Sequence, residues 1–416
     1  MIQAKSIIKE TSIYALSKLL PGIFGLFFLS LFTRLIGLEE YGKYSLYLAQ
    51  FNLIVSFCYG WLNQSELRYG NDQRSKNKKP SFISLIFYTS FMVFPFVLLF
   101  NNKGESIYSL ILSFYCIFSI GLFSYIKTIY QANLNPKKVF YLTLLQSFLS
   151  LFLPLIGYFY FSINSKYLLF FTGTSSFLSL LIFIQDKKIV SLLPIDFKKS
   201  FSTIKKWIYF GIPVSIWSSV GLLLPFLDRF YIDKFFNLES VGIYSSLNEL
   251  CIRAFSFFIF PFTMAIHPRI TKLWNNNNKK DALKIIFAAL KYILIFFIAS
   301  ILILFIFNEE IFSLIKIILP KLPYESIILF FPLAISGIIW QLTLIAHKMI
   351  ELEEKTLFMI LFIFLSLIVN LIGNNLFLPK YGIIATAYTS LISSSLYCCL
   401  SFLYLIFNIK LKKNNI

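Results

Sequence analysis

Long apolar runs, separated by short polar segments, constrain this chain more than any other feature. Hydrophobic residues make up 58% of the sequence and charged residues only 14%, which is more apolar surface than a water-soluble core could bury. A helix needs about 20 such residues to cross the hydrocarbon of a bilayer. We therefore predict an all-α polytopic membrane protein with twelve transmembrane helices, at residues 13–36, 44–66, 81–100, 107–131, 139–161, 167–185, 207–235, 242–266, 284–307, 326–347, 357–377 and 382–407.

The first apolar run, Ile13 to Ile36, is too long for the core of a signal peptide, and no small-residue cleavage site follows it. We expect it to remain as the first span. Five cysteines, Cys58, Cys116, Cys251, Cys398 and Cys399, all lie within apolar runs. We interpret them as packing residues and expect neither disulfides nor a metal site, and no cofactor motif is evident.

Charge is distributed unevenly between the connections. Those after even-numbered spans are basic, as are both ends of the chain, whereas those after odd-numbered spans are short and nearly neutral. Only the loop with Glu351, Glu353 and Glu354 departs from this alternation. Because basic loops stay on the cytoplasmic side, we predict that both termini are cytoplasmic. The same rule explains the net charge of +19 without a nucleic-acid partner.

An internal repeat is the second constraint. The segment from Leu38 to Ser45 (LEEYGKYS) recurs 200 residues later, from Leu238 to Ser245 (LESVGIYS), and a second, more apolar pair matches at an offset of 216. Apolar runs often match by chance in so apolar a chain, but the first pair also matches at polar and turn residues. The pattern predicts two bundles, 1–200 and 201–416, with six spans each. An even number gives parallel repeats around a central cavity, related by an axis along the membrane normal.

Ionisable residues within spans are costly and normally face a cavity or one another. The candidates are Lys18, Lys127, Asp228, Arg229, Glu249 and Arg253. Arg229 lies nine residues before Leu238 and Glu249 eleven after it, so both sit roughly 15 Å below that hairpin tip. Glu249 and Arg253 are four residues apart and share a helix face.

Two interpretations of these charges stay open. They form a buried structural network, or they line a polar cavity in which Arg229 or Arg253 binds a diphosphate through its planar guanidinium group. Lys18 is deep enough to face a cavity open to the cytoplasm, and it is equally able to extend to the membrane surface. Asp228 or Glu249 could bind a coupling ion, H⁺ or Na⁺.

Glycine and proline mark the expected turns. Gly42 and Gly242 suit a tight entry into the helices that follow them, and Pro379 with Gly382 suits the last external turn. The stretch from Glu309 to Glu325 is predicted to form an interfacial helix on the outer side.

Several short motifs resemble those of polysaccharide flippases of the multidrug/oligosaccharidyl-lipid/polysaccharide exporter superfamily. They are RLIGLEEYG at 34–42, DRFYI at 228–232 with VGIY at 241–244, and NLFLPKYGIIA at 375–385, which follows Asn370. ATA at 385–387 stands where the family usually has Gly-Ala-Ala. The resemblance extends over essentially the whole chain. It implies an inner-membrane transporter that flips undecaprenyl-pyrophosphate-linked oligosaccharides, such as O-antigen or capsule repeat units, with membrane lipids and a polysaccharide polymerase as candidate partners.

Three other functions compete with this one. A membrane polymerase or glycosyltransferase needs a large external loop, which the sequence lacks, and no nucleophile, metal or phosphate-loop motif appears. A drug/cation antiporter of the same superfamily would concentrate acidic residues in the pathway, whereas this chain has at least as many bases there. A peptidoglycan-precursor flippase usually has additional spans, which this length does not allow. An enzyme is therefore not expected, and the sequence does not identify the sugar.

Overall fold

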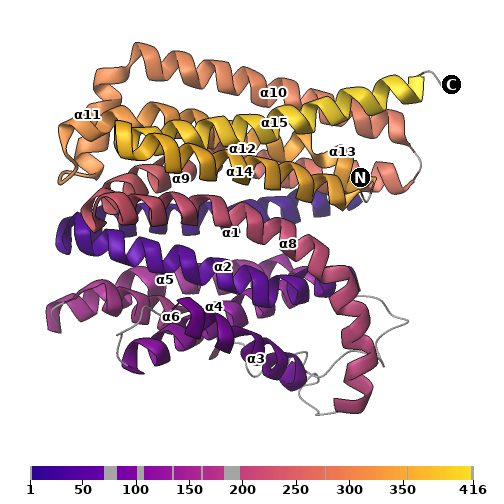
Figure 1. The fold of residues 1–416 in the computed structure, drawn as a ribbon. Helices are drawn as coiled ribbons and strands as arrows, with labels where there is room; N and C mark the ends of the chain where they lie inside the picture. The colour runs from indigo at the N-terminus through magenta and orange to yellow at the C-terminus, as the bar shows by residue number, and fades with distance from the viewer. Residues whose placement is uncertain are drawn as a thin grey trace. The chain divides into compact units, whose positions relative to one another are not determined.

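The computed structural model describes residues 2–69, 82–100, 107–133, 135–160, 163–181, 197–276, 278–353 and 355–413. Over these ranges the chain forms helices joined by short segments, with no β-strand (Figure 1). The all-α prediction is confirmed. The helices are α1 (Ile2–Leu35), α2 (Gly37–Tyr69), α3 (Phe82–Phe100), α4 (Ile107–Ala132), α5 (Pro136–Tyr160), α6 (Ser165–Leu181), α8 (Phe197–Phe235), α9 (Leu238–Asn275), α10 (Lys279–Ile306), α11 (Asn308–Ile318), the 3₁₀ helix η2 (Tyr324–Leu329), α12 (Phe330–Ala346), α13 (Lys348–Leu352), α14 (Thr356–Tyr381) and α15 (Ile383–Lys413).

Contacts divide the chain into two compact units. Unit 1 contains Met1–Ala15, Leu29–Ser45 and Leu227–Ile416, and unit 2 contains Leu16–Phe28 and Leu46–Phe226. The helices α1, α2 and α8 each contribute residues to both units. The division into 1–200 and 201–416 concerns sequence repeats rather than contacts, and it stays a prediction.

Unit 1 is built around α9, α10, α12 and α15, with α14 packed along α15. Its core includes Ile259, Ile286, Ile293, Ile345 and Leu405, each less than 5% exposed. In unit 2, α6 packs against both α4 and α5, and α3 packs against α4. In each unit, neighbouring helices therefore pack through apolar side chains. Close packing of this kind holds membrane helices together.

Seven helical stretches in the described part of the chain are long and apolar enough to cross a membrane. They are Ile107–Ala132, Pro136–Tyr160, Gly211–Phe235, Lys279–Ile306, Tyr324–Leu352, Thr356–Tyr381 and Ile383–Phe407. The chain is therefore a multi-pass membrane protein, while the total of twelve spans stays a prediction. Much of the basic loop sequence, including 70–81 and 182–196, lies outside the described residues.

The two glycines expected at helix entries have a different role in the structure. The second helix begins earlier, at Gly37, whose φ of 88° is the conformation that glycine adopts without strain. Gly42 and Gly242 lie in the second turns of α2 and α9 and pack against each other's helix within unit 1. The prediction of a tight entry at these two positions was therefore wrong, because helical geometry already exists before each glycine.

This glycine contact is reciprocal. A Cβ atom on Gly42 would overlap the carbonyl oxygen of Leu238, and a Cβ atom on Gly242 would overlap the carbonyl oxygen of Leu38. In each segment, the glycine packs against the carbonyl oxygen of the leucine four residues before the other glycine. Equivalent residues contact each other in this way around a two-fold axis. Only a residue without a side chain permits this approach.

The remaining turn predictions are met in part. Gly382 ends α14 with a φ of 74°, as expected of a turn glycine, whereas Pro379 lies inside the last turn of that helix. The segment after α10 does form a separate helix, α11, with Glu309 and Glu310 in its first turn. Within unit 1, α11 is joined to α1, where the Ser30 hydroxyl donates to the Ile318 carbonyl at 2.6 Å and Arg34 donates to the Ile317 carbonyl. Its interfacial position stays a prediction.

Candidate functional site

Three of the predicted intramembrane charges meet in unit 1. An Nη2 nitrogen of Arg229, on α8, lies 3.7 Å from Oε1 of Glu249, on α9. The corresponding nitrogen of Arg253 lies 3.4 Å from Oε2 of the same carboxylate. One carboxylate is therefore shared by two arginines. We refer to Arg229, Glu249 and Arg253 as the charged triad.

Neutral donors and acceptors position the charged triad. Tyr41, fully buried near the start of α2, donates from its hydroxyl to Oε2 of Glu249 at 3.0 Å. Arg229 donates from Nε to the hydroxyl of Ser245 at 3.0 Å and is only 8% exposed. The side chain of Arg253, by contrast, is 30% exposed. Arg229 is thus the more constrained arginine, and Arg253 is the one whose guanidinium group is more accessible.

Asp228 directly precedes Arg229 in the sequence, but its carboxylate has hydrogen-bond partners of its own. Its carboxylate, 2% exposed, accepts hydrogen bonds from four neutral side chains. These donors are the Tyr244 hydroxyl at 2.7 Å, the Asn370 amide at 3.0 Å, the Asn374 amide at 2.9 Å and the Ser390 hydroxyl. The acid therefore connects α8 with α9, α14 and α15. A direct role of Asp228 in holding the arginines stays a prediction.

Of the two predicted lysines, the structure describes the side chain of Lys127 only. Lys127, on α4 in unit 2, is partly buried, with its Nζ atom 5.7 Å from the centroid of the Phe123 ring. That geometry is a cation–π contact between residues one helical turn apart. The side chain of Lys18 lies outside the described residues. The structure thus brings together three of the six predicted site residues, with Asp228 beside them in sequence.

Sequence reasoning missed the uncharged members of the site. Tyr41, Tyr244, Asn370, Asn374 and Ser390 each hold a carboxylate, yet none carries a charge that would mark it within an apolar span. The available signal was the presence of asparagines in the middle of α14, where both Asn370 and Asn374 are fully buried. A buried amide in a membrane helix needs a partner, and its partner here is Asp228.

The electrostatics favour an anion near Arg253. The charged triad contains two positive groups and one negative group, which leaves one excess positive charge. Both ion pairs are long for charge-assisted hydrogen bonds, which are strongest at about 2.7–2.9 Å. Arg253, whose side chain is 30% exposed, therefore presents its guanidinium group to a ligand with several oxygen atoms.

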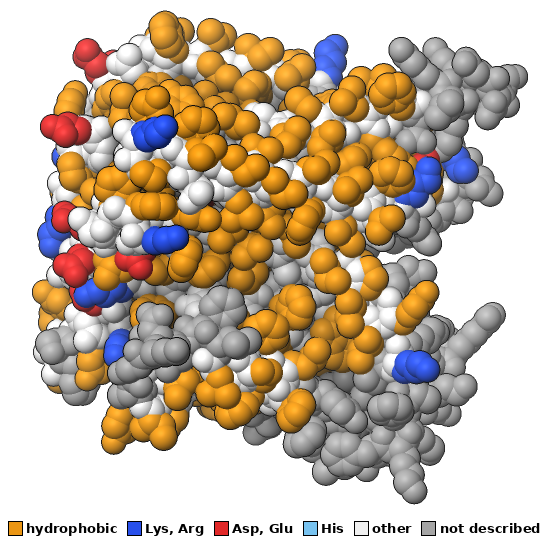
Figure 2. Space-filling view, in the orientation of Figure 1, with side chains coloured by type: hydrophobic (Ala, Val, Ile, Leu, Met, Phe, Trp, Pro, Cys, Tyr) orange, Lys and Arg blue, Asp and Glu red, His pale blue; other side chains and the backbone are white. Residues whose placement is uncertain are grey.

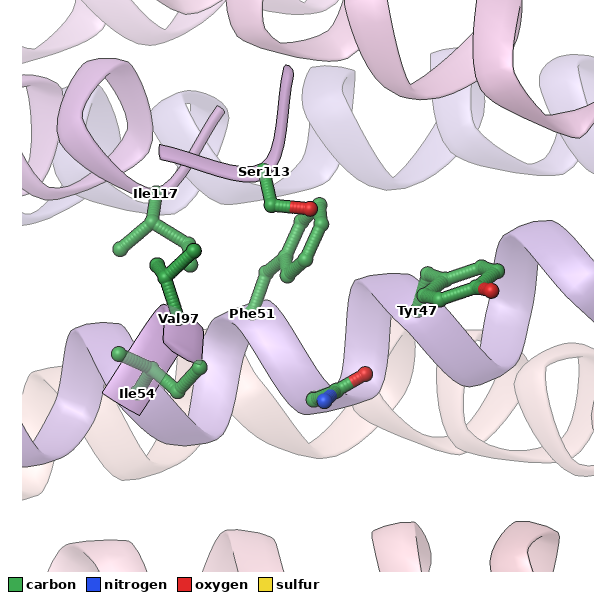
Figure 3. Close-up of a pocket in the computed structure, with 7 residues that line it drawn as sticks. Tyr47, Phe51, Ile54, Val97, Ser113 and Ile117 are labelled. Carbon is green, nitrogen blue, oxygen red and sulfur yellow. The ribbon is translucent and has the colours of Figure 1, made fainter. Parts of the chain in front are cut away.

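Two further features of the described residues lie outside the charged triad. Over α10 and α15 the surface is mostly apolar (Figure 2). Unit 2 contains a cavity of about 10 Å³, which has room for no more than about one water molecule (Figure 3). It is lined by Tyr47, Gln50, Phe51 and Ile54 of α2, Val97 of α3, and Ser113 and Ile117 of α4. The larger central cavity predicted from the sequence stays a prediction.

The described part of the chain shows no sign of metal or disulfide chemistry. No group of three or more His, Cys, Asp or Glu residues is placed to hold a metal ion in that part. The five cysteines are free, and all but Cys399 are buried. The four buried cysteines have the environment of packing residues, whereas Cys399 does not.

Comparison with known proteins gives a family for the chain and two transport proteins of similar fold. A family model described as "Polysaccharide biosynthesis protein" matches residues 7–274. The fold resembles that of the lipid II flippase MurJ in an inward closed conformation, with a TM-score of 0.73 and 16% identity over 94% of this chain and 87% of the other. It also resembles a multidrug resistance MATE family transporter of the MOP superfamily. The inward-facing form of that transporter gives a TM-score of 0.65 and 14% identity, over 98% of this chain and 99% of the other. No curated protein sequence matches the chain.

Proposed function

The chain belongs to the polysaccharide biosynthesis protein family, and from this premise we propose that it flips lipid-linked oligosaccharides across a bacterial inner membrane. The substrate class that we propose is an undecaprenyl-pyrophosphate-linked repeat unit of a surface polysaccharide, such as O-antigen, lipopolysaccharide or capsule. A multi-pass helical fold shared with a lipid flippase supports a transport role rather than catalysis. Cytoplasmic termini and a polymerase that receives the flipped unit belong to the same proposal.

The observation that carries this proposal is the charged triad. A diphosphate has several anionic oxygens, and guanidinium groups bind such oxygens in a planar, two-pronged geometry. Arg253 is the more exposed arginine, so we assign it to contact the diphosphate. Arg229 positions Glu249, whose single negative charge offsets one of the two arginine charges while the site is empty. Substrate then competes with Glu249 for Arg253, and this competition couples binding to a rearrangement of α8 and α9.

Asp228 is the preferred site for a coupling ion. It is an almost fully buried acid, and Oδ1 of Asn374 lies buried in its vicinity with no hydrogen-bond partner among the described residues. A proton would neutralise the carboxylate, whereas Na⁺ would draw on the side-chain oxygens around it. Transport into proteoliposomes under an imposed pH gradient or an imposed Na⁺ gradient distinguishes the two ions.

A drug/cation antiporter is the second candidate, because the MATE transporters share this fold over nearly the whole chain. The family match to polysaccharide biosynthesis and the excess positive charge of the triad both favour the anionic substrate over a cationic one. Drug efflux from cells that overexpress the chain would test this alternative directly.

The deciding experiment replaces the triad arginines in cells that depend on this protein for surface polysaccharide. We expect Arg253→Ala to abolish export and Arg253→Lys to restore it only partly, because a point charge does not reproduce the guanidinium fork. Arg229→Ala should also abolish export, through misplacement of Glu249.

Lys380→Ala is the matched control, since Lys380 is an exposed basic residue in the last turn of α14. Its export should be unchanged. Membrane fractions must contain each variant at the level of the unsubstituted protein. Normal surface polysaccharide in cells with only the Arg229→Ala/Arg253→Ala double variant would refute the diphosphate role.

A further inference from the structure

The helix α10 has one buried face and one exposed face. Ile286, Ala289, Leu290 and Ile293 are each at most 6% exposed and pack into the core of unit 1. The opposite face presents Phe287, Leu294, Ile295, Ile298 and Leu302, each 45–53% exposed. In a span of this length, such a face contacts lipid.

Three lysines lie on the same side of α10 as that apolar face, two of them before it begins and one within it. Lys280, Lys284 and Lys291 are all exposed. Spacings of four and seven residues place their side chains within about 40° of one another around the helix. They share this face with Phe287 and Ile298, whereas the packed residues lie on the other face. The lysines therefore form a basic row, Lys280–Lys284–Lys291, directed toward lipid.

Lys291 lies inside the apolar part of the helix. It follows Ile285, the first residue of that part, by six residues, or roughly 9 Å along the axis. A lysine can extend toward the membrane surface, but a charge at this depth is still unfavourable without a counter-charge. Within the described ranges, no acidic residue forms an ion pair with Lys291. Lys284 is paired with Asp281 at 2.9 Å, at the water-exposed start of the helix.

We propose that this basic row binds the phosphate headgroup of an anionic phospholipid, in the leaflet at the Lys279 end of α10. Lys284 and Lys291 are roughly 10 Å apart along the axis, so both flexible side chains can approach one phosphate. The acyl chains lie along the exposed apolar residues that follow, including Ile295 and Ile298. The proposal depends on α10 spanning the membrane and is independent of the transported substrate.

Native mass spectrometry of the purified chain in non-ionic detergent tests the proposal. The probes are phosphatidylglycerol and phosphatidylcholine with identical acyl chains. The unsubstituted chain should retain more phosphatidylglycerol. Each lysine near a headgroup contributes about 1 kcal/mol, or about fivefold in affinity. Lys291→Gln should therefore weaken phosphatidylglycerol binding about fivefold and leave phosphatidylcholine binding unchanged, whereas Lys291→Arg should retain the preference.

Lys380→Gln is the control for a general loss of positive charge and should bind both lipids as the unsubstituted chain does. Inorganic phosphate at millimolar concentration should not displace phosphatidylglycerol, and displacement would mean that the row binds free anions rather than a lipid. An unchanged lipid preference in the Lys280→Gln/Lys284→Gln/Lys291→Gln variant would overturn the proposal. A dimer that this variant abolishes would do the same, because a second copy would then occupy the face.

Discussion

At the scale of single residues, Glu249 connects the two arginines of the charged triad. It contacts Arg229, Arg253 and the hydroxyl of Tyr41. Its side chain is 19% exposed, between the values for the two arginines. A ligand that reaches Arg253 must therefore compete with this carboxylate. The competition sets both how tightly an anion binds and how readily it leaves.

Replacement of Glu249 by glutamine should separate these two effects. We expect Glu249→Gln to bind undecaprenyl pyrophosphate more tightly, because the competing negative charge is gone, and to transport more slowly, because release is then disfavoured. Binding measured by native mass spectrometry and export measured in cells would show the divergence. A parallel loss of both would mean that Glu249 serves only to keep the arginines folded in place.

Asp228 gives a stability prediction. In Asp228→Leu no carboxylate oxygen faces the amide donors of Asn370 and Asn374, so buried hydrogen bonds are lost at roughly 1–3 kcal/mol for each group left unsatisfied. We expect a clearly lower melting temperature in detergent. Asp281→Asn, in the exposed first turn of α10, should change it little. Equal melting temperatures for both variants would contradict the hydrogen-bonding pattern described for Asp228.

At the scale of helices, the contact between α2 and α9 depends on two glycines. Gly42→Ala and Gly242→Ala should each destabilise the protein by about 1–3 kcal/mol, the usual cost of overpacking, because the added methyl group meets backbone rather than a movable side chain. Gly22→Ala is the control, since nothing lies within 4 Å of its added Cβ. Thermal unfolding of the three variants checks this, and the double variant should fall short of the sum because the contact is shared.

The same helices show what the sequence could and could not predict. Helix type and approximate position follow from apolar length, and the meeting of Arg229 with Glu249 follows from counting residues on either side of Leu238. The mutual packing of Gly42 and Gly242 could not be predicted from the sequence. Glycine is favoured both in turns and where two helices approach closely, so its presence does not distinguish the two. The environment of Asp228 did not follow either, since Asn370 and Ser390 come from helices more than 140 residues away, and periodicity does not determine which helices are neighbours.

At the scale of the whole molecule, the positive-inside rule makes a topology prediction. Reporter fusions should place Asn71–Lys79 and Asn275–Asp281 on the cytoplasmic side and Asn101–Glu105 on the outer side. Fusions at both termini should report the cytoplasm. An outer location for either basic loop would reduce or shift the predicted set of twelve spans, and it would reverse the leaflet assigned to the basic row on α10.

The reciprocal glycine contact has a consequence for genetics. The atoms opposite Gly42 belong to the backbone of Leu238 and Gly242, and those opposite Gly242 belong to the backbone of Leu38. Every amino acid at those positions supplies the same backbone atoms, so no substitution there makes room for a methyl group. A selection for second-site suppressors of Gly42→Ala should therefore recover no changes at 38, 238 or 242. Both positions, 200 residues apart, therefore require glycine, and a substitution at one of them does not make room for a side chain at the other.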